Sequence, residues 1–124
     1  MALCLAAGAV SAVLAINGFT LAWMHSIERV RWEEDWRIAA GQLWLVAARV
    51  KGSGAGMEPP DDAQLQCGAW HYRPRVPALA RLTLAHSPYA AGYELCAGGA
   101  CRELADYLPG IEASTTIVLA ACRE

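Results

Sequence analysis

His25 and Glu34 are the two residues of this sequence whose types and spacing are best suited to chemistry. An imidazole and a carboxyl group held side by side can act as an acid–base pair, bind a polar group of a ligand, or neutralise each other in a structural contact. A functional pair needs an opening to solvent, whereas a structural pair does not. Which alternative applies depends on the elements that carry the two residues.

Two neighbouring strands are predicted to carry this pair. Residues 19–27 and 30–38 both alternate with a period of two, which is typical of β-strands, and residues 28–29 are the natural turn between them. In the second strand the charged residues occupy one face, which is therefore solvated. The opposite, apolar face would carry Phe19, Trp23, Trp32 and Trp36 beside the proposed pair.

The predicted hairpin register brings the imidazole and the carboxyl group together. A turn at residues 28–29 places His25 opposite Trp32 and Trp23 opposite Glu34, so that His25 and Glu34 are diagonal neighbours. A carboxylate on an apolar face must be paired, hydrogen-bonded or protonated. We therefore expect His25, Trp32 and Glu34 to belong to a binding surface, with a purely structural pair as the alternative.

The glycine-rich segment at residues 52–56 is a second candidate for ligand binding. Its sequence, Gly52-Ser53-Gly54-Ala55-Gly56, offers closely spaced backbone N–H groups that could surround an anion. A phosphate-binding P-loop would end in Gly-Lys-Ser or Gly-Lys-Thr and continue into a helix, whereas two prolines follow here. A plain connecting loop is the alternative to an anion site.

Other catalytic and metal-binding patterns are weak. The three histidines, at positions 25, 71 and 86, are not spaced as ligand pairs on one element. Ser26 neighbours His25, but adjacent strand residues point to opposite faces, so His25 is poorly placed to activate it. We therefore predict no catalytic residue, no metal site and no cofactor.

The cysteines predict one local disulfide. Gly98 and Gly99 fit a two-residue hairpin turn, which would place Cys96 opposite Cys101 at a distance that a disulfide can span. Two reduced thiols are the alternative that a cytosolic location would impose. The count of five cysteines leaves at least one thiol unpaired, and both a cytoplasmic and a periplasmic or membrane-associated location stay open.

Composition bounds the class of protein. A chain of 124 residues fits one domain, and a net charge of -2 without a run of like charges excludes the electrostatic pattern of a nucleic-acid-binding protein. Hydrophobic residues make up 56% of the chain, which leaves membrane association or a shared interface open. Residues 1–24 are uncharged and long enough to span a membrane, but turn residues divide residues 1–18 into strand-length pieces, and we favour strands there.

The remaining pattern predicts a mainly β fold. Strands are expected at residues 42–50, 69–73, 79–86, 93–96, 101–103 and 115–122, with at most one short helical turn near residues 104–108. Together with the amino-terminal strands this gives about eight short strands joined by closely spaced turns. We expect a single antiparallel β-sandwich or a partly closed barrel spanning residues 1–124.

Several segments resemble a bacterial domain-of-unknown-function family, number eighteen-fifty. The similarity is carried by residues 25–28, 32–36 and 52–60, and extends to Trp70-His71-Tyr72, Ser87-Pro88-Tyr89 and the segment from Cys96 to Cys101. The resemblance implies a small protein often encoded beside tripartite (TRAP-type) uptake transporters. It also implies that His25, Ser26, Glu34 and the loop from Gly52 to Gly56 are shared positions.

These observations give one leading function and two alternatives. The leading hypothesis is a non-catalytic accessory domain associated with uptake of small organic acids, which binds transporter components or a small anionic ligand. The binding residues would be His25, Ser26, Trp32, Glu34, Gly52, Ser53, Gly54 and Gly56. The alternatives are a small hydrolase with a His/Glu acid–base pair and a purely structural interaction domain.

Overall fold

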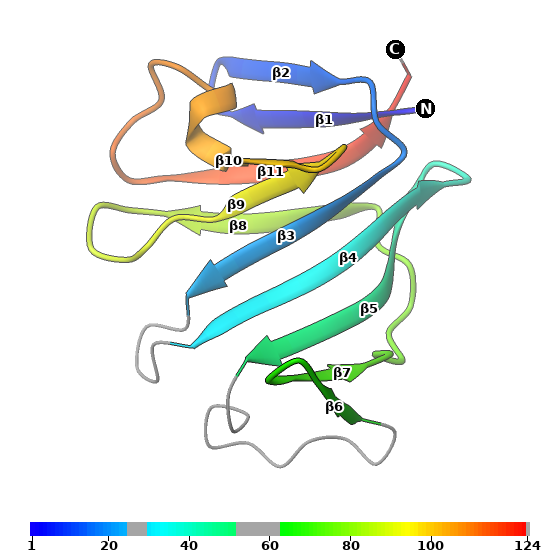
Figure 1. The fold of residues 1–124 in the computed structure, drawn as a ribbon. Coiled ribbons are helices and arrows are strands. Elements are labelled where there is room, and N and C mark those ends of the chain that lie inside the picture. Colours follow the sequence, from blue (N-terminus) through cyan, green and yellow to red (C-terminus); the bar gives the residue numbers. More distant parts are fainter. Residues whose placement is uncertain (25–29, 52–62, 124) are drawn as a thin grey trace.

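The computed structural model describes residues 1–24, 30–51 and 63–123, and these residues form two antiparallel β-sheets (Figure 1). Every pair of neighbouring strands is antiparallel, and within the described residues the sheets are stacked without closing into a barrel. The predicted β-sandwich is therefore confirmed. His25, Ser26 and the segment from Gly52 to Gly56 lie outside the described residues.

The smaller sheet has four strands in the order β2-β1-β11-β8. Its strands are β1 (Ala2–Ala7), β2 (Val10–Leu14), β8 (Arg81–His86) and β11 (Thr115–Cys122). The uncharged amino-terminal segment thus pairs with the carboxy-terminal strand, and Gly8, whose φ is 60°, makes the turn between β1 and β2. None of the helices in the described part of the chain is long and apolar enough to cross a membrane.

The larger sheet has seven strands in the order β10-β9-β3-β4-β5-β7-β6. Its strands are β3 (Gly18–Met24), β4 (Arg31–Ala39), β5 (Gln42–Lys51), β6 (Gln64–Gln66), β7 (Ala69–Tyr72), β9 (Glu94–Ala97) and β10 (Ala100–Glu103). A single 3₁₀ turn, η1 (Leu104–Tyr107), follows β10. The described residues therefore contain eleven strands, more than the sequence predicted, because short segments such as β6 pair only at the edge of the sheet.

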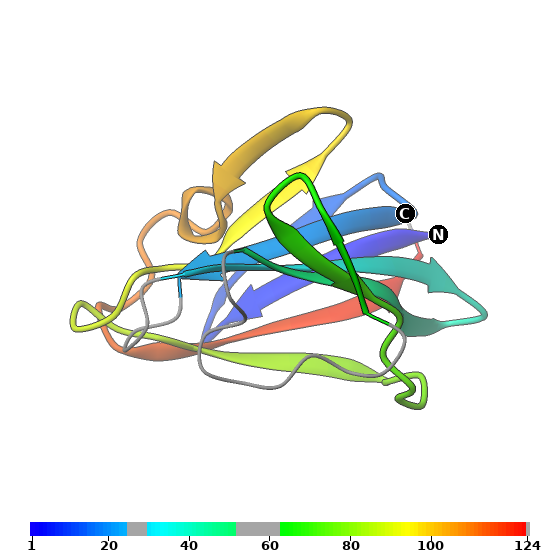
Figure 2. The ribbon, with the colours of Figure 1, turned by 60° about the horizontal axis from the view of Figure 1, so that its bottom comes forward.

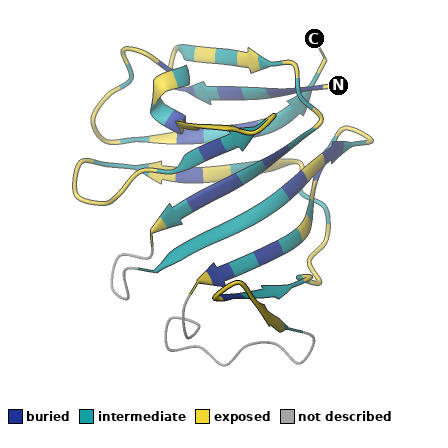
Figure 3. Cartoon of the chain, in the orientation of Figure 1, coloured by how far each residue is buried: buried dark blue, intermediate teal, exposed yellow. Residues whose placement is uncertain are grey.

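The core lies between the two sheets because alternate residues of each strand point inward. The four-stranded sheet contributes Leu3, Leu5, Leu84, Ile117 and Leu119, and the seven-stranded sheet contributes Phe19, Leu21, Trp36, Ile38, Leu43 and Leu95. Leu104 and Leu108, in and just after η1, are also fully buried. No polar or charged residue is fully buried in the described part of the chain, and the half of β4 that precedes Trp36 is only partly covered (Figure 3).

The β3–β4 register corrects one prediction. Trp23 pairs with Trp32, and Leu21 pairs with Glu34, so the predicted pairing of Trp23 with Glu34 is wrong by two residues. Met24 and Arg31 are the last pair of this ladder within the described residues, and the residues that connect the two strands include the undescribed segment 25–29. A shift of two residues preserves the period of two, so each side chain stays on its predicted face.

Candidate functional site

Glu34 lies on the inner face of the seven-stranded sheet. Its neighbours across the ladder are Leu21 on β3 and Ala48 on β5, both of which are buried and apolar. The residues two positions away on the same strand and face are Trp32 and Trp36. The site therefore begins as one carboxyl group on an otherwise apolar, aromatic surface.

Aromatic side chains surround this carboxyl group. The Trp23 ring stacks on Trp32 with centroids 6.4 Å apart, and Trp23 contacts Tyr93 in a tilted arrangement at 5.7 Å. On the other side, Tyr72 pairs with Ala48, whose small side chain lies between Tyr72 and Glu34 in the cross-strand row. We call Glu34 together with Trp23, Trp32, Tyr72 and Tyr93 the Glu34 cluster.

Burial controls the protonation of Glu34. Desolvation raises the pKa of the Glu34 carboxyl above its ordinary value, and no ion pair to Glu34 is found within the described residues. The indole N–H of Trp36 interacts with the Glu34 carboxyl group and lowers its pKa, which offsets part of this rise. The contact is weak, because the buried Trp36 nitrogen has no hydrogen bond of ordinary geometry within the described residues. Glu34 is thus a carboxylate that the surrounding described residues solvate poorly.

The two tyrosines respond to the same charge. Desolvation raises the pKa of both Tyr72 and Tyr93, and the negative charge of Glu34 raises each pKa further. Both phenol groups therefore lie within electrostatic range of the carboxylate, although they come from different ends of the sheet. A single charge influences side chains from β4, β7 and the segment that precedes β9.

The cluster is open to solvent. All five of its residues are partly exposed, in contrast to the adjacent Trp36, of which only 4% is exposed. A surface hollow of about 250 Å³ reaches Trp23 and Tyr93 and is also lined by Met24, Ala85, Ser87, Ala90 and Ala91. A molecule in solution can therefore approach the aromatic rings without unfolding a strand.

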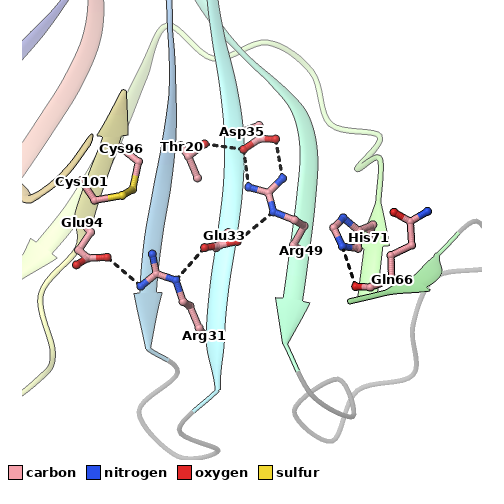
Figure 4. Close-up of polar contacts among 10 residues, drawn as sticks. All are labelled: Thr20, Arg31, Glu33, Asp35, Arg49, Gln66, His71, Glu94, Cys96 and Cys101. Carbon is pink, nitrogen blue, oxygen red and sulfur yellow. Dashed lines mark hydrogen bonds and ion pairs between the residues drawn. A yellow bond between two sulfur atoms is a disulfide. The ribbon is translucent and has the colours of Figure 1, made fainter. Parts of the chain in front are cut away.

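The outer face of the same strands has the opposite electrostatic arrangement (Figure 4). Arg49 donates to both carboxylate oxygens of Asp35 at 2.7 and 2.8 Å and to Glu33 at 3.0 Å. Asp35 also accepts a 2.7 Å hydrogen bond from the Thr20 hydroxyl. Arginine therefore neutralises the charges of Glu33 and Asp35, the two residues that flank Glu34 in the sequence. Glu34 has no such ion pair within the described residues.

Arg31 extends this outer network toward β9. Its guanidinium lies 2.8 Å from Glu33 and 2.9 Å from Glu94 (Figure 4). For Glu33, desolvation opposes ionisation, but the hydrogen bonds from Arg31 and Arg49 outweigh it and lower the pKa. Hydrogen bonding from Arg49, supported by Thr20, likewise lowers the pKa of Asp35 despite desolvation. This network ties four strands together and needs no ligand.

The structure separates the predicted site residues into two groups. Trp32 and Glu34 lie together on the inner face. The other predicted binding residues, His25, Ser26, Gly52, Ser53, Gly54 and Gly56, lie outside the described residues, so their proximity to Glu34 stays a prediction. Among the described residues, no group of three or more His, Cys, Asp or Glu side chains could hold a metal ion.

Tyr72 and Tyr93 were missed by the sequence reasoning. Tyr72 lies in a segment that was predicted to be a strand, but the pairing of that strand with β5 was not predicted. Tyr93 enters the site through contact with Trp23, and no spacing rule links those two positions. The aromatic content of both segments was visible in the sequence, but it does not specify strand order.

Two disulfides are present in the structure. Cys96 pairs with Cys101 across the Gly98–Gly99 turn, in which both glycines have positive φ. Cys4 is bonded to Cys122 and thereby links β1 to β11, a pairing that the sequence spacing did not indicate. Cys67, in the turn between β6 and β7, is an exposed free cysteine.

Comparison with family models gives a match over most of the chain. Residues 19–104 match the model of a family described as Domain of unknown function (DUF1850). This range contains every residue of the Glu34 cluster and of the outer network, but excludes β1, β2 and β11. No curated protein matches the chain. No solved structure matches it either.

Proposed function

The chain belongs to the DUF1850 family, a domain of unknown function, and from that premise we propose that it is a non-catalytic binding domain whose recognition surface is the Glu34 cluster. One observation carries the proposal. Glu34 is desolvated among partly exposed aromatic rings and has no ion pair within the described residues, whereas Glu33 and Asp35 on either side are fully paired.

Such a carboxylate is costly for the folded protein. A desolvated charge destabilises the folded state unless a partner compensates it, and the same strand shows that this sheet can supply arginine partners. A binding role explains why the cost is retained, because a ligand or partner would satisfy the carboxylate on association. Partly exposed tryptophan and tyrosine rings are also the side chains that dominate recognition surfaces.

The proposed partner is a component of a tripartite uptake transporter for small organic acids. This proposal rests on the resemblance described above and adds a setting to the binding surface. The paired cysteines support a location in an oxidising compartment, where disulfides persist. His25, Ser26, Gly52, Ser53, Gly54 and Gly56 are proposed to complete the surface from outside the described residues.

A co-purification experiment tests the proposal. The tagged chain would be co-expressed with the solute-binding and membrane components of a tripartite uptake transporter, and the retained components would be quantified with and without detergent. We expect Glu34→Gln to lower retention at least about tenfold, the change that corresponds to 1.4 kcal/mol. Glu33→Gln removes the same charge from the opposite face and should retain them. Equal retention by the wild-type chain, Glu34→Gln and Glu33→Gln would contradict a role for the Glu34 cluster in binding.

A hydrolase remains the rival proposal. It would use Glu34 or His25 as a general base in a pocket shared with Ser53, and both His25 and Ser53 lie outside the described residues. Hydrolysis of a p-nitrophenyl ester panel by the wild-type chain, abolished by Glu34→Gln, would favour this alternative over a binding domain.

A further inference from the structure

We infer that the Glu34 cluster binds a small organic cation of the alkylammonium class, with Glu34 as the counter-charge and the surrounding tryptophan and tyrosine rings as walls. This inference rests on the proposed binding function and names the ligand class for the same surface. It is drawn from the charge and ring arrangement of the inner face, and it differs from the anionic ligand expected at the glycine-rich loop.

The carboxylate sets the sign of the ligand charge. The arginines nearest in the ladder, Arg31 and Arg49, point to the outer face, where both are committed to acidic side chains. Within the described residues, the inner face around Glu34 therefore carries a negative charge without a cation. An anionic ligand would be repelled there, and a neutral ligand would leave the desolvated charge uncompensated.

The rings select an organic cation over a metal ion. One carboxylate supplies too few oxygen ligands for Ca²⁺ or Mg²⁺, and the described residues hold no cluster of metal-ligating side chains. Aromatic faces, in contrast, attract alkylated ammonium groups through the negative potential of the ring, and several rings around one acidic group form a recognised cage for such ions. Trp23, Trp32 and Tyr93 form a continuous ring surface on one side, and Tyr72 lies on the other.

The access route fits a small ligand. The hollow lined by Trp23 and Tyr93 has a volume of about 250 Å³, slightly below the roughly 300–1,000 Å³ of most ligand pockets, and it lies on the Trp23 and Tyr93 side of the cluster. Ala48 occupies the ladder position between Glu34 and Tyr72, so no large side chain separates the carboxylate from that ring. A quaternary ammonium head group is compact enough for such a space.

Choline and its neutral isostere 3,3-dimethyl-1-butanol provide the test. The two probes have nearly the same shape and differ in charge, so a difference in affinity measures recognition of the cation. The full chain would be titrated with each probe, with sodium chloride as the ionic-strength control, while tryptophan fluorescence is recorded. The indole N–H signals in a nitrogen-15 correlation spectrum give a second readout that locates the probe.

We expect choline to bind at least about tenfold more tightly than the isostere, with shifts confined to the indole signals of the cluster. Glu34→Gln should remove this preference, whereas Glu33→Gln, which has the same net charge, should keep it. Circular dichroism would verify that each variant is folded. Tyr72→Leu provides a second variant and should weaken choline binding several-fold without changing net charge.

The inference is overturned if choline gives no saturable response, if the isostere binds equally well, or if Glu34→Gln retains the preference. Each of these outcomes is separable from failure of the proposed function. A chain that retains transporter components through Glu34 but ignores choline would be a binding domain for another ligand. A chain that binds choline but retains no component would have the cation site without the proposed partner.

Discussion

Three consecutive acidic residues on β4 illustrate how position on a strand decides the role of a side chain. Glu33 and Asp35 point to the outer face and are paired with arginines, whereas Glu34 points inward to aromatic rings. The pKa of Glu34 is raised by desolvation, and the pKa values of its two neighbours are lowered by hydrogen bonding. A carboxylate therefore stabilises the fold at positions 33 and 35 and destabilises it at position 34.

Neutralising Glu34 is therefore expected to stabilise the protein. Glu34→Gln should raise the free energy of unfolding at neutral pH by about 1 kcal/mol, because the desolvation cost of an uncompensated group is of that order. Glu33→Gln should lower it, because two arginines lose their partner. Urea denaturation at constant m-value measures both changes. A Glu34→Gln variant less stable than Glu33→Gln would contradict this account of the two faces.

The pH dependence has opposite signs for the two faces. A raised pKa means that the folded state holds the Glu34 proton more tightly than the unfolded chain does. The ordinary pKa of a glutamate side chain is 4.5. As the pH rises above this value, the charge of Glu34 should begin to lower the free energy of unfolding, and the full loss should be reached above the folded-state pKa. The advantage of Glu34→Gln over wild type should vanish in acid and grow with pH, as measured by urea midpoints across the range.

Asp35 supplies the reverse case. Its pKa is lowered in the folded state, so its contribution is present above the ordinary value of 3.8 and is lost as the pH falls through the folded-state pKa. The destabilisation caused by Asp35→Asn should therefore be largest at neutral pH and disappear in strong acid. A penalty that stayed constant with pH would mean that packing, and not charge, accounts for the effect.

At the scale of elements, the outer network couples β4 and β5 where the register changes. The ladder shifts between Asp35 and Trp36, and the two hydrogen bonds from Arg49 to Asp35 lie immediately beside this β-bulge. A paired arginine and aspartate at a bulge hold the two strands in one alignment. The network thus helps to fix which residues of β4 face the core.

A double-mutant cycle measures this coupling. Asp35→Asn, Arg49→Gln and the double variant should give a coupling free energy of about 1 kcal/mol, above that of most exposed ion pairs because the contact is bidentate and partly buried. Thermal unfolding of the four proteins supplies the values. Additive effects of the two substitutions would show that the pair does not stabilise the sheet.

The faces of the strands were predictable from the sequence, but their register was not. Alternation along residues 19–27 and 30–38 assigned Glu34 to the same face as its tryptophan neighbours, as the structure has it. The register depended on where the turn lies between the two strands, which the sequence does not specify when typical turn residues are missing. At residues 98–99, where two glycines define the turn, the pairing of Cys96 with Cys101 followed directly.

Contacts between distant segments were the part that sequence patterns could not supply. The row that joins Tyr72 to Ala48 and Glu34 requires β7 to lie beside β5, and β-strand order depends on the whole fold. The Cys4–Cys122 bond requires the first and last strands to be neighbours, which no local spacing encodes. Five cysteines allow many pairings, and only the short-range pair had a local signal.

At the scale of the whole molecule, the first strand β1 lies beside the last strand β11 (Figure 2), and the two disulfides differ in the length of chain they enclose. The sequence separations are 118 residues for Cys4–Cys122 and 5 residues for Cys96–Cys101. Chain-entropy arguments assign about 4.9 kcal/mol to the long closure and about 2.1 kcal/mol to the short one. We therefore expect Cys4→Ser/Cys122→Ser to lower the unfolding free energy more than Cys96→Ser/Cys101→Ser, measured by urea denaturation without reductant. A larger loss for Cys96→Ser/Cys101→Ser would show that the Cys4–Cys122 bond does not stabilise the protein mainly by restricting the unfolded chain.

The bond between Cys4 and Cys122 also has a mechanical meaning. The chain from Cys4 to Cys122 is a covalent ring that encloses both sheets. Tension applied to the chain on the outer sides of Cys4 and Cys122 would be carried by the sulfur bridge and would bypass both sheets. Reduction of that single bridge would transfer the load to the ladder between β1 and β11 and make the sandwich extensible from its ends.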